Sequence, residues 1–112
     1  MTRETLLARI EAEFTIAAHA QSIGNDGMVR VCARRAAGVA IAFWVATHHR
    51  QGWGTDAITQ LRALRNDASI PQHVRDAAER LMAKITLQFT PAFTADPVLD
   101  SKTIINHLLE NS

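Results

Sequence analysis

The stretch AAGVAIAFWVAT, residues 36–47, decides the fold, because it is apolar on every side of any helix that it forms. It lies within a longer segment, from about Gly27 to Arg50, whose spacing predicts one long helix. A helix that is apolar all round has to be covered on more than one side. Its small residues let another backbone approach closely, which accounts for Gly38 in a helix interior. Residues 36–47 are therefore predicted to lie at the centre of a helical bundle.

Helical spacing predicts further helices on both sides of this segment. The first runs from about Thr2 to Gln21, and its apolar stripe consists of Leu6, Leu7, Ile10, Phe14 and Ala17. Gly24 is expected to end it, because helices commonly end with a glycine in the left-handed region. Asn25 or Asp26 is then expected to cap the central helix.

Two shorter helices are predicted to follow the central one. Thr55 is expected to cap the third helix, which extends to about Asn66. The stretch Ser69-Ile70-Pro71-Gln72 is typical of a capping box, and the fourth helix continues from it to about Leu87.

Asp96 and Pro97 are expected to open the last helix as cap and first-turn proline. Its apolar face consists of Val98, Leu99, Ile105, Leu108 and Leu109. The predicted fold is all-α, an up-and-down antiparallel bundle of four main helices plus a short fifth. Residues 1–112 are predicted to form a single domain, as the length also favours.

Composition excludes several classes of protein. The apolar fraction of 47% is typical of a globular chain, so disorder is not expected. Twelve basic and eleven acidic residues nearly cancel, whereas nucleic-acid binders usually carry a basic excess. The first residues mix both charges with apolar side chains, so they are not expected to act as a secretory signal, and no apolar run approaches the roughly 20 residues that span a bilayer. We therefore expect a cytoplasmic protein without membrane contact.

The sequence offers little for catalysis or for metal binding. Cys32 is the only cysteine, which excludes an internal disulfide and a Cys-rich zinc site, and it is expected to act as a small buried hydrophobic residue. His48 and His49 are adjacent, so helical geometry does not let both face one metal. The glycines at 52–54 lack the following lysine of a phosphate-binding loop. We expect no metal and no cofactor.

Two arginine pairs and one tryptophan are candidates for ligand binding. Arg30 and Arg34 share a helix face, as do Arg62 and Arg65; each pair either clamps a phosphate or acidic partner, or lies on a solvated face. In the second case their acidic partners would be Glu11, Glu13 or Asp67. Trp53, between two glycines, either plugs the end of the bundle or contacts a ligand.

A small-molecule site near Trp53 is a further hypothesis, because helix ends meet there. The side chains expected to converge on it are His48, His49, Trp53 and Asp56. The slim central helix also favours a homodimer, since symmetric dimers bury one self-complementary patch. The interface candidates are Ala36, Val39, Ala40, Phe43 and Trp44.

Several segments resemble the HEPN superfamily. They are Gly24-Asn25-Asp26-Gly27, then ARRAAGVAIAFWV at 33–45, and Thr55-Asp56-Ala57-Ile58 leading to QLRAL at 60–64. The resemblance implies an up-and-down bundle, frequently dimeric. It also implies one of two activities: a metal-independent RNase with an Arg and a His spaced four to six residues apart, or a binding module beside nucleotidyltransferase-like partners.

This sequence departs from the RNase signature. No arginine stands at the required distance before a histidine, and Lys102 with His107 is the nearest approach. Lysine lacks the planar fork that holds a phosphate in two places. We therefore expect a non-enzymatic, HEPN-like, dimeric module that binds a nucleotide, RNA or a protein. The alternative is an RNase that uses the degenerate Lys102/His107 pair.

Overall fold

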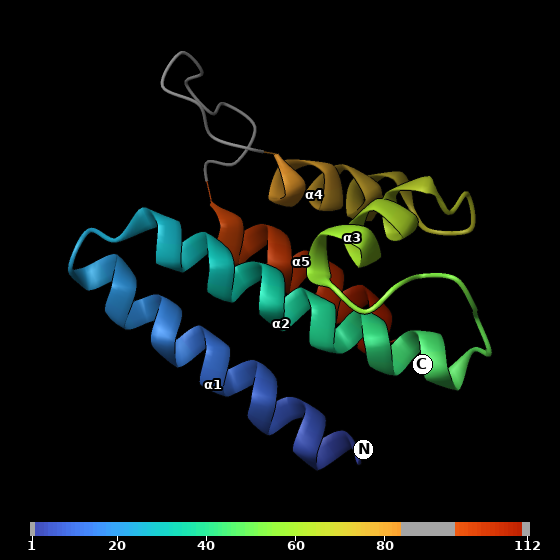
Figure 1. Cartoon of the computed structure of the whole chain (residues 1–112), viewed down its shortest axis with the longest axis horizontal. Coiled ribbons are helices and arrows are strands. Elements are labelled where there is room, and N and C mark those ends of the chain that lie inside the picture. Colours follow the sequence, from blue (N-terminus) through green and yellow to red (C-terminus); the bar gives the residue numbers. More distant parts are fainter. Residues whose placement is uncertain (1, 84–95, 111–112) are drawn as a thin grey trace.

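A computed structural model describes residues 2–83 and 96–110 of the chain. Every regular element in those two ranges is a helix, and one core cluster draws buried side chains from all five of them. The helices are α1 (Arg3–Ser22), α2 (Asp26–Thr47), α3 (Ala57–Asn66), α4 (Gln72–Met82) and α5 (Pro97–Glu110) (Figure 1). The predicted all-α bundle is therefore confirmed. The fifth helix, with 14 residues, is longer than α3 and α4.

The hairpin of α1 and α2 forms because both helix junctions carry the right capping groups. The Thr2 side chain accepts a hydrogen bond from the Thr5 amide at the start of α1. Gly24 adopts a φ of 73°, and the Asn25 side chain then accepts from the Met28 amide to begin α2, as predicted. On α1 the predicted stripe is buried at Leu6, Ile10 and Ala17 and half-buried at Phe14, whereas Leu7 is 44% exposed.

The central helix α2 packs against all four other helices. It runs antiparallel to α1, whereas α5 lies beside it in the same direction (Figure 1). Small residues make these contacts close. A Cβ added at Gly38 would lie 2.9 Å from Gln60 Oε1 and 3.5 Å from the Ala57 Cβ, so the glycine allows α3 to approach. Ser101 of α5 donates to the Ala33 carbonyl oxygen at 2.7 Å.

Two predicted caps are wrong. Asp56, and not Thr55, caps α3 by accepting from the Thr59 amide and hydroxyl. The predicted capping box at Ser69 does not form, because the Ser69 amide and hydroxyl both donate to Asp67 Oδ1 in a tight turn. Pro71 precedes α4 without a side-chain cap.

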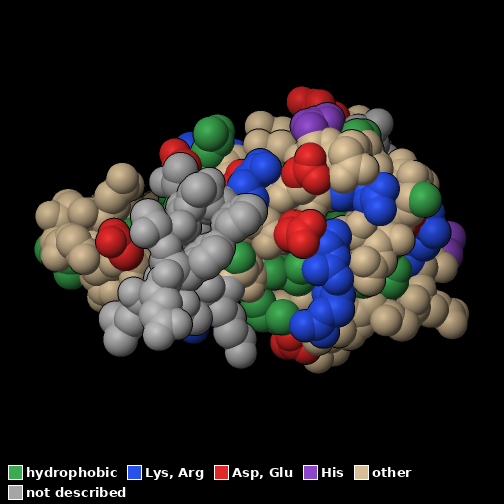
Figure 2. All heavy atoms as spheres, turned by 90° about the horizontal axis from the view of Figure 1, so that it is seen from above, with side chains coloured by type: hydrophobic (Ala, Val, Ile, Leu, Met, Phe, Trp, Pro, Cys, Tyr) green, Lys and Arg blue, Asp and Glu red, His purple; other side chains and the backbone are tan. Residues whose placement is uncertain are grey.

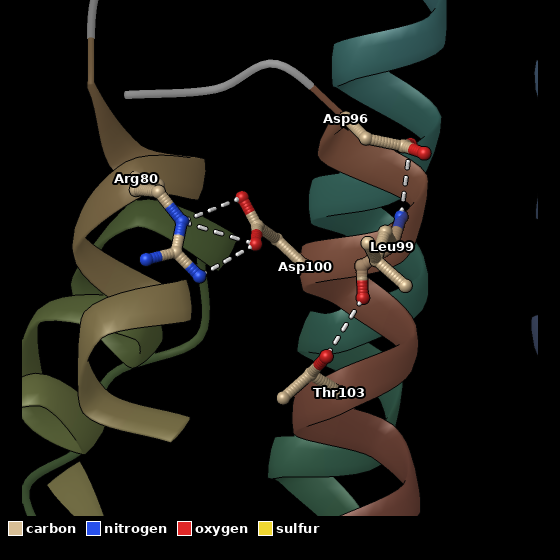
Figure 3. A network of polar contacts seen from close by, with 5 residues as sticks. All are labelled: Arg80, Asp96, Leu99, Asp100 and Thr103. Atoms are coloured by element: carbon tan, nitrogen blue, oxygen red, sulfur yellow. Dashed lines mark hydrogen bonds and ion pairs between the residues drawn. The ribbon is translucent and has the colours of Figure 1, made fainter. Parts of the chain in front are cut away.

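The fourth helix was predicted to continue to about Leu87, but α4 ends at Met82. Of the remaining predicted residues, Ala83 is not helical and residues 84–87 lie outside the described ranges. Asp96 caps α5 as predicted, since its Oδ1 accepts from the Leu99 amide at 3.0 Å (Figure 3). Leu99 itself was expected to be buried but is 59% exposed, and it lies on the side of α5 away from α4. Within the described ranges, none of the helices combines the length and the apolar character that crossing a membrane requires.

Candidate functional site

A groove lies between α1, α2 and the segment that leads into α3. Its volume is about 520 Å³, and it is open to solvent. Its floor is a row of small or half-buried apolar side chains on α2, and polar side chains from α1, α2 and α3 lie around it. The lining residues are Arg9, Glu13, Arg35, Gly38, Val39, Ala42, Phe43, Ala46, Thr47, Thr55, Ala57 and Gln60.

Three of these side chains carry charges that are not paired within the described part of the chain. Arg9 and Glu13 come from α1, and Arg35 comes from α2. The Oε2 atom of Glu13 is buried and has no hydrogen-bond partner there. A buried acceptor without a partner costs about 1–3 kcal/mol. One oxygen of this carboxylate is therefore left without a donor.

Glu13 also lies beside Cys32, which is fully buried, as expected. Burial, followed by the charge of Glu13 and a hydrogen bond to it, raises the pKa of the Cys32 thiol, while Arg35 acts in the opposite direction. A buried thiol with a raised pKa is unreactive. Because Glu13 and Arg35 both affect the pKa of this thiol, the two side chains lie near the same level of the hairpin.

The predicted arginine pair on α2 is divided between two environments. Arg34 donates to the carbonyl oxygens of Leu81 and Ala83 at 2.8 and 3.1 Å, and so binds the carboxyl end of α4. Arg30 is 8% exposed, and its Nε and Nη1 atoms have no partner. Burial lowers the pKa of Arg30, against the opposing charges of Asp100 and Asp26. Neither arginine is positioned for an external phosphate.

The acidic partners expected for the two arginine pairs also differ from those in the structure. Asp67 pairs with Arg50 at 3.7 Å rather than with a member of either pair. Arg65 lies 4.0 Å from Glu79, and Arg62 is exposed on α3.

Arg80 and Asp100 form an ion pair that the sequence did not indicate. Arg80 at the end of α4 donates from both Nε and Nη2 to Asp100 on α5, with Nη2 2.9 Å from Oδ1 (Figure 3). The hydrogen bond to Asp100 raises the pKa of Arg80.

On the face seen from above, Lys and Arg side chains form a short band with Asp and Glu side chains beside it (Figure 2). That face therefore offers no continuous basic field to a nucleic acid.

Of the four side chains predicted to converge near Trp53, two meet: Trp53 and His48 both pack on Trp44. Trp53 is half-buried and packs on Trp44 with ring centroids 5.4 Å apart, so it covers the core as a plug. His48 stacks on the same indole at 4.5 Å. Asp56 turns to its own helix, and hydrogen bonds from Thr59 lower its pKa. His49, exposed and with a φ of 53°, has no described contact with Asp56.

The candidate RNase pair is separated across α5. The Lys102 Nζ atom lies 5.5 Å from the centroid of the Phe14 ring on α1. His107 is half-buried, and burial followed by the charge of His73 on α4 lowers its pKa. The two side chains therefore turn toward different neighbouring helices.

The five predicted dimer-interface residues divide into two groups. Ala36, Ala40 and Trp44 are at most 5% exposed within one chain, because the other helices of the bundle already cover them. Those three offer no surface to a partner. Val39 and Phe43 are half-buried and line the groove. Sequence reasoning missed Arg9, Glu13 and Arg35, although Arg35 lies in register with Val39 on α2 and that signal was available.

No group of three or more His, Cys, Asp or Glu side chains in residues 2–83 and 96–110 is arranged to hold a metal ion. Comparison with known proteins gives no match: no family model fits the chain, and no curated protein and no solved structure is similar to it. The groove is therefore the candidate functional site.

Proposed function

We propose that this chain is a non-enzymatic, HEPN-like binding module whose groove receives a helix of a partner protein. The observation that carries the proposal is the floor of the groove. Ala42 and Ala46 are exposed on it and Val39 and Phe43 are half-buried, so an apolar row follows the axis of α2. A partner helix that lies in such a groove inserts apolar side chains at intervals of three and four residues.

The charges of the groove favour a protein over a nucleotide or RNA. The carboxylate of Glu13 repels a phosphate, and it stands in the same groove as Arg9 and Arg35. A protein surface can present a cation to Glu13 and anions to the two arginines at once. The arginine that was expected to hold phosphate, Arg34, binds the end of α4 instead.

The positions of Lys102 and His107 support a non-enzymatic role. Two groups that act on one phosphodiester have to lie within reach of the same atoms. Here one is directed to α1 and the other to α4. A nucleotidyltransferase-like protein is the partner class that the HEPN resemblance implies, and a second copy of the chain is the partner that the sequence predicts.

Photo-crosslinking in cells tests the proposal. A photoreactive amino acid at Thr55, an exposed residue at the edge of the groove, is expected to form protein adducts. The same amino acid at Asn106, exposed on α5 outside the groove, serves as the control. Adding Ala42→Glu should abolish the Thr55 adducts by placing a charge on the floor. Nucleic-acid adducts at Thr55, or equal protein adducts at both positions, would contradict the proposal.

An RNase assay tests the competing activity. Purified protein is incubated with unstructured RNA beside the His107→Ala variant. We expect no cleavage by either protein. Cleavage by the parent protein that the variant lacks would establish the enzyme instead.

A further inference from the structure

We propose that the groove is filled by the tip of the α1–α2 hairpin of a second copy, with Glu13 paired to Arg35 of the partner subunit. This inference rests on the proposed function and names the partner. The two hairpins would form a four-helix interface around a two-fold axis.

The tip of the α1–α2 hairpin is an exposed apolar surface. Four of the six large apolar side chains that the described residues expose lie near the tip of the hairpin, where α1 ends and α2 begins: Ile16, Ile23, Met28 and Val31. Ile23 is 64% exposed and Met28 is 39% exposed, so the tip is a protruding apolar surface. Nothing in the described part of the chain covers it.

The protruding tip and the hollow groove lie on one face of α2. From Met28 the chain reaches Val31, Arg35, Val39, Ala42 and Ala46 in steps of three or four residues, which is the spacing of a single helix face. Arg35, Val39, Ala42 and Ala46 line the groove, so Met28 and Val31 continue the same face. At 1.5 Å per residue the tip and the floor are roughly 20 Å apart.

A two-fold axis placed midway between them makes this face complementary to itself. It brings the large side chains at each tip onto the small alanines at 42 and 46 of the other copy. Symmetric dimers use one such patch twice. Met28 suits this contact, because its flexible side chain fills irregular gaps.

The same face carries opposite charges that a two-fold axis brings together. Arg35 lies near the midpoint of the face, and Glu13 of α1 lines the same groove; both lie close enough to Cys32 to affect the pKa of its thiol. Around a two-fold axis at this level, each Glu13 faces Arg35 of the partner subunit. Each such pair would engage two charges that have no ion-pair partner in the described part of one chain.

Charge reversal with mixing tests the pairing. The parent protein is expected to be a dimer by light scattering on a sizing column. Glu13→Arg and Arg35→Glu each place like charges at both contacts, and we expect self-association at least about 100-fold weaker in each. An equimolar mixture restores opposite charges at both contacts and is expected to form a heterodimer. Arg62→Glu, outside the groove, changes the net charge equally and should leave the dimer intact.

The result of mixing excludes a pair within one chain, since such a pair would not be restored by a second copy. A monomeric parent protein at micromolar concentration would overturn the inference, as would a mixture of two folded variants that stays monomeric. If Glu13→Arg proves unfolded by circular dichroism, Ala42→Glu replaces it, and a dimer that survives this change overturns the inference. Protein adducts at Thr55 from a monomeric chain would leave the proposed function standing and remove only this partner.

Discussion

Replacing Arg30 with methionine is expected to stabilise the fold, although it removes a buried charged residue near the start of α2. The Arg30 guanidinium is buried, and its Nε and Nη1 atoms have no hydrogen-bond partner. Burial lowers its pKa even though Asp100 and Asp26 attract it, so its surroundings disfavour the charged form. Methionine keeps most of the apolar stem and has no donor to leave unsatisfied.

The size of the effect follows from those two atoms. Each buried donor without a partner costs about 1–3 kcal/mol. Part of this cost is already offset by the attraction of Asp100 and Asp26. We therefore expect the free energy of unfolding to rise by about 1–2 kcal/mol, within the range seen when buried charges are replaced by apolar residues.

Arg34→Met provides the matched control, because it lies one turn away on the same helix. Its guanidinium donates to the carbonyl oxygens of Leu81 and Ala83, so its loss is expected to destabilise the fold by about 2–3 kcal/mol. Urea unfolding followed by circular dichroism measures both changes from the shift of the midpoint at constant slope. A loss of more than about 1 kcal/mol in the Arg30 variant would show that Arg30 has stabilising partners, and would refute the reasoning.

Three other changes have defined outcomes. Asp100→Asn removes the carboxylate that Arg80 grips with two nitrogens, and it should lower the unfolding free energy by about 1–3 kcal/mol in the same urea assay, whereas an unchanged midpoint would mean that the ion pair is energetically neutral. The pKa of His107 is lowered below 6.5 by burial and by His73, so the unfolded chain binds more protons. This stability is present above pH 6.5 and is lost as the pH falls through the folded pKa; His107→Asn should flatten that part of the stability profile, and a parallel profile would contradict the assignment. Gly54 has a φ of 75°, and an added Cβ would lie 2.6 Å from a threonine methyl carbon in α3. Gly54→Ala should therefore lower the melting temperature, by about 4–8 °C for each kcal/mol of stability lost. An unchanged melting temperature would show that the loop adjusts without strain.

The sequence could predict those features of the fold that depend only on neighbouring residues, such as the helix caps. Asn25 and Asp96 cap their helices as expected, because a cap depends on a side chain and on amides two or three residues away. Ser69 shows the limit of the same reasoning. A capping box needs the Ser69 amide to donate to the Gln72 side chain, but this amide donates to Asp67 Oδ1 instead. The path of the chain decides between these two local bonds.

The groove could not be predicted from spacing alone. The small residues of α2 indicated a close neighbour, but not which helix covers which side. Ala36 and Ala40 therefore looked as suitable for a partner as Val39, although the bundle itself covers them. Glu13 and Arg35 are more than twenty residues apart along the chain, and only the packing of α1 on α2 places them in one groove.

The position of α1 at one side of the bundle has a consequence for how the molecule opens. α1 packs chiefly against α2, whereas α2 is also held by α3, α4 and α5. Segments with few tertiary contacts exchange their amide hydrogens through local openings that need less energy than global unfolding. Deuterium should therefore enter α1 before it enters α2, and whatever binds across the hairpin would slow that uptake most.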